Sequence, residues 1–238
     1  MLLYINKGIA FKEGLAVAAR IHIFTGHFGS GKTEIAVNYA LGLARQGKKT
    51  IIVDCDIVNT YFRTLDVKEK LEENGIEVIA PLFANSNLEM QMMPAEILSV
   101  FEKKDYEVVF DVGGDEDGAF ALGGYKRFFE REGYEMYFVV NTSRPLTENC
   151  DDTLVYMGEI ERASRLNITK VVNNSNIAGE TTVENIYKGD SVVSEICEKT
   201  KLEYAFISGT KEILENIDES RVKCDKRFEI KRFLMIEF

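Results

Sequence analysis

Long apolar runs, paired cysteines and an excess of positive charge are all missing from this 238-residue sequence. No apolar run is long enough to cross a membrane. The four cysteines contain no C-x-x-C pair, which argues against a disulfide framework, a zinc site or an iron–sulfur cluster. Lys and Arg total 29 against 39 Asp and Glu, so the net charge of −10 disfavours broad contact with nucleic acid.

The first twenty residues make a poor secretion signal. Their apolar patch, 14–19, is short, and Lys7, Lys12 and Glu13 interrupt the region. We interpret residues 1–20 as an N-terminal extension and expect a cytoplasmic protein with reduced thiols. The three prolines all fall near expected element ends, and no linker or repeat divides the chain, so its length fits one α/β domain.

Short apolar segments alternate with helical patterns along the chain. The segments are rich in β-branched and aromatic residues, which is typical of strands buried on both faces of a parallel sheet. The predicted strands are 21–25, 50–54, 77–79, 107–112, 136–140, 170–172 and 204–207. The predicted helices are 33–45, 67–74, 151–165 and 191–200, with Leu154, Val155, Met157, Ile160 and Ala163 as the buried face of the third. This alternation predicts an α/β fold, a doubly wound, mostly parallel sheet with helices on both faces.

Residues 26–33, Gly-His-Phe-Gly-Ser-Gly-Lys-Thr, match the phosphate-binding pattern G-x-x-x-x-G-K-T between a predicted strand and a predicted helix. Its glycines let successive backbone N–H groups turn toward phosphate oxygens, and the helix dipole adds positive potential. Lys32 brings a charge to the β- and γ-phosphates, and the Thr33 hydroxyl can bind Mg²⁺. The predicted nucleotide contacts are Gly26, His27, Phe28, Gly29, Ser30, Gly31, Lys32, Thr33 and Glu34.

Carboxylates follow two of the other predicted strands. Asp54 and Asp56 come at the end of one strand and point the same way, so both can reach one metal–water cluster, although an ordinary acidic turn is the alternative. Asp111 follows three apolar residues in the Walker B pattern, in which the carboxylate holds Mg²⁺. Asp111 also opens a D-x-x-G sequence whose glycine, Gly114, can approach the γ-phosphate.

Two further segments near these motifs have more than one interpretation. Residues 115–124 are acidic and glycine-rich, which favours a mobile, solvated loop over a second metal site. Asn173 and Asn174 follow a late strand, and their amides suit either a base edge or a local turn. The N-K-x-D signature of guanine-specific proteins is absent there, which favours adenine.

With these motifs the chain resembles the ParA/MinD-type P-loop ATPases of the CobQ/CobB/MinD/ParA nucleotide-binding superfamily, and a bacterial branch of it in particular. The resemblance is strongest over residues 21–56 and weaker through Asp111 and Asn173, and residues 29–34 and 54–63 carry the similarity to that branch. It implies ATP and Mg²⁺ as cofactors, with Asp54 and Asp111 serving the metal. It further implies that Asp56 places the attacking water and that Asn173 or Asn174 contacts adenine.

One residue departs from the superfamily pattern. ParA/MinD loops carry a lysine directly after the first glycine, and this lysine reaches the partner's phosphates across a dimer; here the position is His27. Histidine is shorter and largely neutral near pH 7, so the departure puts the ATP-driven homodimer in doubt. A turn residue in a solvent-facing slot is the other interpretation of His27.

The leading functional hypothesis is a Mg²⁺-dependent ATPase or ATP-driven switch formed by residues 21–225, with Lys32 and Asp56 as catalytic residues. Alternatives are an ATP-dependent ligase or kinase acting on a small acceptor, and a nucleotide-gated module that recruits an unidentified protein or a membrane. For residues 226–238 the alternating pattern favours an edge strand or packed tail over a membrane element.

Overall fold

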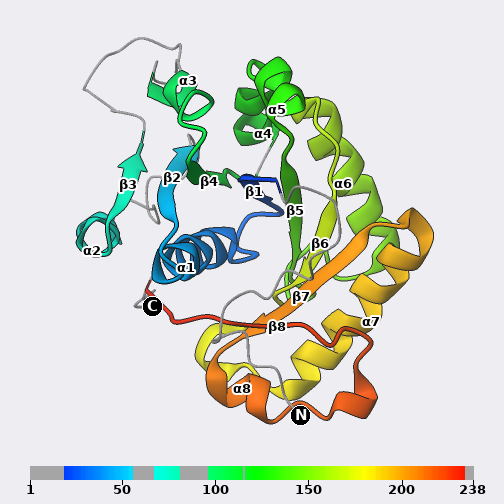
Figure 1. Cartoon of the computed structure of the whole chain (residues 1–238). Helices are drawn as coiled ribbons and strands as arrows, with labels where there is room; N and C mark the ends of the chain where they lie inside the picture. The colour runs from blue at the N-terminus through cyan, green and yellow to red at the C-terminus, as the bar shows by residue number, and fades with distance from the viewer. Residues whose placement is uncertain (1–18, 56–66, 81–95, 115, 234–238) are drawn as a thin grey trace, which may run out of the picture.

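The computed structural model describes residues 19–55, 67–80, 96–114 and 116–233 (Figure 1). Its strands form one parallel sheet in the order β3-β2-β4-β1-β5-β6-β7-β8. The strands are β1 (Ile21–Thr25), β2 (Lys49–Cys55), β3 (Ile76–Ile79), β4 (Tyr106–Val112), β5 (Glu135–Val140), β6 (Lys170–Asn173), β7 (Glu203–Gly209) and β8 (Arg227–Glu229). The predicted strands and the predicted α/β class are therefore confirmed.

Helices cover both faces of this sheet (Figure 1). They are α1 (Lys32–Arg45), α2 (Lys68–Glu73), α3 (Glu96–Val100), α4 (Glu116–Gly123), α5 (Lys126–Glu132), α6 (Cys150–Ser164), α7 (Val183–Thr200) and α8 (Lys211–Glu215). In β1, Ile21 and Ile23 pack on the side of α3 to α7, whereas Phe24 packs against α1. Successive side chains of a strand point to opposite faces, so the apolar strand sequence fills two cores at once.

Three details of the predicted secondary structure were wrong. Val155 is 63% exposed, because α6 turns only part of its apolar residues toward the sheet. The acidic, glycine-rich segment after β4 is the helix α4 and not a loop. A Cβ atom built on Gly118 would lie 2.7 Å from Gly113 Cα, so that glycine permits close packing. Helix α7 begins at Val183, before the predicted start at 191, since the Thr182 N–H donates to Asn185 Oδ1 at 2.8 Å and so begins the helix.

The segment after β8 packs along α1. Strand β8 is the last strand of the sheet, pairing only with β7 among the described residues. Beyond it, Asn38 Nδ2 donates to the Lys231 carbonyl and Asn38 Oδ1 accepts from the Lys231 N–H, both at 2.8 Å. The Phe233 N–H donates to Glu34 Oε1 at 2.6 Å. Residues 230–233, which we call the strap, thus run along α1 toward its N-terminus.

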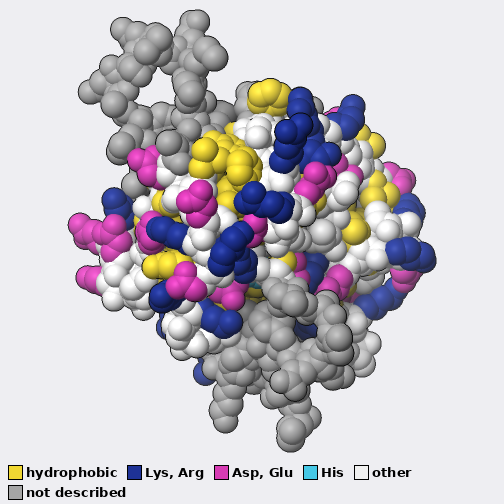
Figure 2. Space-filling view, turned by 45° about the horizontal axis from the view of Figure 1, so that its top comes forward, with side chains coloured by type: hydrophobic (Ala, Val, Ile, Leu, Met, Phe, Trp, Pro, Cys, Tyr) yellow, Lys and Arg dark blue, Asp and Glu magenta, His cyan; other side chains and the backbone are white. Residues whose placement is uncertain are grey.

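The described surface mixes charges of both signs. On the face in Figure 2, Lys and Arg side chains lie among Asp and Glu side chains, and exposed apolar side chains form small patches. Of the helices that the structure describes, none combines the length and the apolar character that a bilayer crossing requires.

Candidate functional site

The loop between β1 and α1 is held in a shape that only glycine permits at two positions. Gly26 has φ 147° and Gly31 has φ 86°. A Cβ atom on Gly26 would lie 2.5 Å from the Val139 carbonyl oxygen, and one on Gly31 would lie 2.3 Å from Asn174 Nδ2. Side chains at these positions would push the loop away from the ends of β5 and β6, so the loop depends on both glycines.

Polar groups and a cation gather in and beside the loop. Helix α1 has Gly31 as its N-cap with no side-chain cap, so the first backbone N–H groups of the helix are not satisfied by a cap. Ser30 Oγ and Thr25 Oγ1 are buried and have no hydrogen-bond partner among the described residues. Lys32 is only 5% exposed and lies in the first turn of α1, beside the half-buried Thr33. Donors and a cation in this arrangement suit a chain of phosphates.

Two carboxylates lie side by side next to this loop. Asp54 of β2 and Asp111 of β4 are register partners in adjacent parallel strands, and Asp111 is also the register partner of Phe24 in β1. Each is 1% exposed. Strand alternation places both on the α1 face, the same face as Ile52 and Val109. The structure therefore places Asp54 and Asp111 side by side on the sheet face that α1, with Lys32 and Thr33 in its first turn, covers; Asp56 lies outside the described residues.

Such a donor set fits a magnesium ion that shares its coordination with phosphates. Within the described ranges, no three His, Cys, Asp or Glu side chains group closely enough to hold a metal by themselves. Mg²⁺ is commonly bound through one or two carboxylates together with substrate phosphates and water. Thr33, Asp54 and Asp111 would supply the protein oxygens.

Asn174 has a role that the sequence did not suggest. Its Nδ2 donates to the Ser30 carbonyl at 2.7 Å, and its Oδ1 accepts from Ser208 Oγ at 2.7 Å. It therefore ties the phosphate-binding loop to β6 and β7. A contact between residues 144 positions apart leaves no local signal in the sequence.

Asn173, the last residue of β6, is fully buried. Its Nδ2 donates to the Ile186 carbonyl at 3.0 Å, and its Oδ1 accepts from the Ser175 N–H at 3.1 Å. These bonds use both ends of the amide within the protein. Base contact by Asn173 or Asn174 stays a prediction, and the geometry favours a supporting role for both.

His27 and Gly114 both contact Tyr156 of α6. The His27 ring lies edge-on to Tyr156 of α6, with centroids 5.4 Å apart. Burial and the charges of Lys32 and Arg144 lower the pKa of His27 and outweigh a hydrogen bond with the Phe28 backbone that raises it, which favours the neutral imidazole. The Tyr156 hydroxyl donates to the Gly114 carbonyl. Arg144 closes the outer side, since its Nε donates to the Gly29 carbonyl at 3.1 Å.

Comparison with known proteins agrees with this geometry. The model of the CobQ/CobB/MinD/ParA nucleotide binding domain matches residues 21–213. The chain belongs to this family. No curated protein sequence matches the chain. The family match spans every motif of the site, from β1 to the residues that follow β7.

Solved structures with the fold of this CobQ/CobB/MinD/ParA domain include several FtsY proteins. The cell division protein FtsY of Thermotoga maritima matches with a TM-score of 0.54 and 16% identity, over 79% of this chain and 61% of that one. FtsY of Mycoplasma mycoides gives a TM-score of 0.52 and 16% identity, over 84% and 62%. Chloroplast FtsY of Physcomitrella patens gives 0.54 and 14%, over 82% and 60%. The chain thus spans about three fifths of their length, and the likeness shows the fold alone.

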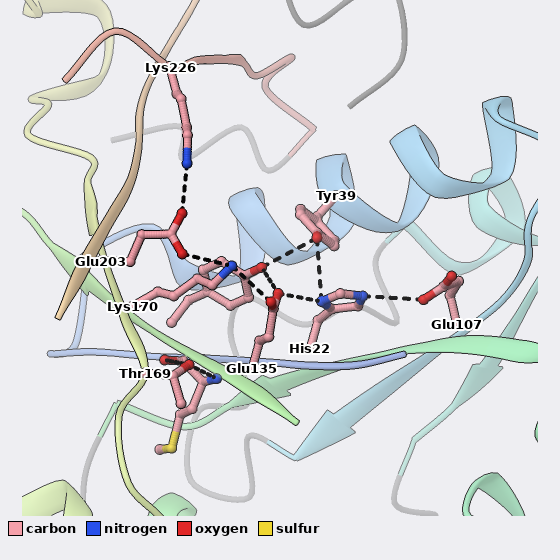
Figure 3. Close-up of polar contacts among 10 residues, drawn as sticks. His22, Tyr39, Glu107, Glu135, Thr169, Lys170, Glu203 and Lys226 are labelled. Atoms are coloured by element: carbon pink, nitrogen blue, oxygen red, sulfur yellow. Dashed lines mark hydrogen bonds and ion pairs between the residues drawn. The ribbon is translucent and has the colours of Figure 1, made fainter. Parts of the chain in front are cut away.

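A second polar cluster lies at the opposite end of β1 (Figure 3). His22 is 2% exposed; its Nε2 is 3.3 Å from Glu107 Oε2 of β4, and its Nδ1 is 3.6 Å from Glu135 Oε2 of β5. Lys170 Nζ pairs with Glu135 at 2.8 Å and with Glu203 at 3.3 Å. The Tyr39 hydroxyl lies 3.4 Å from His22 Nδ1. We call this group, together with Tyr137, the His22 cluster.

Proposed function

We propose that this chain binds Mg-ATP and hydrolyses its γ-phosphate. The observation that carries the proposal is the placement of two buried carboxylates, Asp54 and Asp111, in register beside a phosphate-binding loop whose lysine is almost completely buried. A loop that offers backbone N–H groups and one cation matches a polyphosphate in charge and geometry. Membership of a nucleotide-binding family supports the same class of ligand.

Each residue of the site has a defined task in this proposal. The loop amides and Lys32 stabilise the negative charge that spreads over the transferring phosphoryl group. Thr33, Asp54 and Asp111 hold Mg²⁺, which neutralises charge on the β- and γ-phosphate oxygens when it is bound. Asp56 orients the attacking water, as the family resemblance implies. The missing N-K-x-D signature supports adenine over guanine as the base.

Calorimetric titration tests the ligand, and a phosphate-release assay tests the reaction. We expect Mg-ATP to bind at least about tenfold more tightly than Mg-GTP, equivalent to about 1.4 kcal/mol. Phosphate release from Mg-ATP with no added acceptor is expected and separates hydrolysis from transfer to a small molecule. Tighter binding of GTP would refute the base assignment, and Mg-ATP binding without phosphate release would refute the hydrolysis.

A further inference from the structure

The glycine that ends the D-x-x-G sequence is pressed against the phosphate-binding loop. A Cβ atom built on Gly114 would lie 2.7 Å from the Phe28 nitrogen and 2.9 Å from Lys32 Nζ. Gly114 itself is buried. Because the backbone at Gly114 lies so close to the lysine, its position sets the room available beside the Lys32 ammonium.

One side chain holds this glycine from the far side. The Tyr156 hydroxyl donates a hydrogen bond to the Gly114 carbonyl, and Tyr156 is 7% exposed. Its ring is fixed by two aromatic neighbours: Phe138 of β5, with centroids 6.2 Å apart, and His27 of the loop, at 5.4 Å. The tyrosine therefore contacts the loop through its ring and the D-x-x-G segment through its hydroxyl.

Resting on the proposed function, we infer that Tyr156 is a positioning residue for hydrolysis, which fixes Gly114 against the phosphate-binding loop and links both to α6. In this arrangement His27 packs within its own subunit, at the position where ParA/MinD loops carry the lysine that crosses a dimer. The link passes to α4, because α4 begins just after Gly114 and packs against α6 (Figure 1). If Gly114 shifts when the γ-phosphate is lost, the shift would therefore be passed on to α6 through Tyr156 and α4.

A single hydroxyl deletion separates this role from a structural one. Tyr156→Phe keeps the ring and its two aromatic contacts, and removes the hydroxyl that donates to the Gly114 carbonyl. We expect the dissociation constant of Mg-ATP to stay within about twofold, while the single-turnover rate of phosphate release falls about tenfold, the size expected for one buried hydrogen bond. Hydrogen exchange should become faster in peptides that cover Gly113, Gly114 and α4.

Tyr134→Phe is the matched control. The Tyr134 hydroxyl also bonds to the backbone, here as the acceptor from the Asn167 N–H at 2.9 Å, but it lies before β5, at the end of the sheet away from the loop. Its removal should leave the phosphate-release rate and the exchange of α4 unchanged.

The outcomes divide the two proposals cleanly. Parent-like release and exchange in Tyr156→Phe would overturn the positioning role even in an active ATPase. If nucleotide affinity, melting temperature and release rate all fall together in Tyr156→Phe, Tyr156 is a packing residue, and this result would also overturn the positioning role. If the parent protein itself fails to bind Mg-ATP, the proposed function is wrong. In that case unchanged exchange at α4 in nucleotide-free Tyr156→Phe would also refute the Gly114 contact.

Discussion

Strand β1 carries two polar clusters of opposite construction, one at each end. At its amino end, His22 is paired with Glu107 and Glu135, and further ion pairs extend from them to Lys170. At its carboxyl end, the strand runs into a loop with an uncapped helix N-terminus, buried oxygens of Thr25 and Ser30 without partners among the described residues, and one buried cation, Lys32.

The difference indicates that one end of β1 serves the stability of the fold and the other end serves ligand binding. In the His22 cluster the protein supplies both positive and negative side chains, so their ion pairs offset the free-energy cost of burying the charges. At the loop the protein supplies donors and leaves the acceptors to a ligand. Mutations at the two ends should therefore fail in different assays: those at the loop in nucleotide chemistry, and those at the His22 cluster in the free energy of unfolding.

The largest expected effect is at the loop. Lys32→Ala should abolish measurable ATP hydrolysis, by more than about 10³-fold, because no other cation of the described residues occupies the first turn of α1. The melting temperature should stay near that of the parent, because the Lys32 charge contributes little to the free energy of unfolding. The measurements are phosphate release and thermal unfolding, with the exposed Lys49→Ala as control. Normal affinity and turnover in a folded Lys32→Ala variant would contradict the site.

The carboxylates assigned to the site should separate into two kinds. Asp56→Ala should bind ATP normally and lose about 10²–10⁴ in hydrolysis rate, since a water-positioning group acts mainly in the transition state. Asp111→Asn should instead weaken Mg-nucleotide binding, and the loss should disappear when Mg²⁺ is omitted. Labelled-nucleotide titrations with and without Mg²⁺, beside single-turnover hydrolysis, distinguish them. Parent-rate hydrolysis by Asp56→Ala would make its assigned role wrong.

At the other end of β1, Glu135→Gln should destabilise the fold. Burial disfavours the charged carboxylate, but hydrogen bonds from His22, Lys170 and Tyr137 outweigh it and lower the pKa of Glu135 to about 2. Removing this partner of two cations should cost about 2–3 kcal/mol, less than for a fully buried pair because solvent reaches the carboxylate. Urea unfolding measures the loss, with the exposed Glu198→Gln as control. Reduced nucleotide affinity in folded Glu135→Gln would break the division between the two ends.

The smallest effect is a pH dependence. Burial lowers the pKa of His22, yet the adjoining Glu107 and Glu135 carboxylates raise it more, and the net shift is upward from about 6.5. A raised folded-state pKa adds stability that is fully present below about pH 6.5 and is lost as the pH rises through that folded-state value. The destabilisation of His22→Gln relative to the parent should therefore shrink as the pH rises above about 6.5. A difference that grows with pH would contradict the charged state of His22.

The strands and the loop could be predicted from the sequence because their signals are local. Buried parallel strands are continuous apolar runs, and the loop is one contiguous motif. The contacts that hold the loop could not be predicted, since Asn174 and Ser30 lie 144 residues apart and Tyr156 and Gly114 lie 42 apart. Helix α4 was missed because its glycines and acidic residues are typical of loops, and the tight packing of Gly118 on Gly113, which requires a glycine, is visible only in the structure.

The strap has a consequence for how the protein is made. Lys231 bonds to Asn38 across 193 residues of sequence, and Phe233 bonds to Glu34 across 199. At ribosomal speeds of about 5–20 residues per second, the helix that follows the phosphate-binding loop waits roughly 10–40 s for its covering segment. During that interval its outer face is open to solvent and to chaperones. The nucleotide site of a nascent chain therefore acquires this support only after the 193 residues that separate Asn38 from Lys231 have been added.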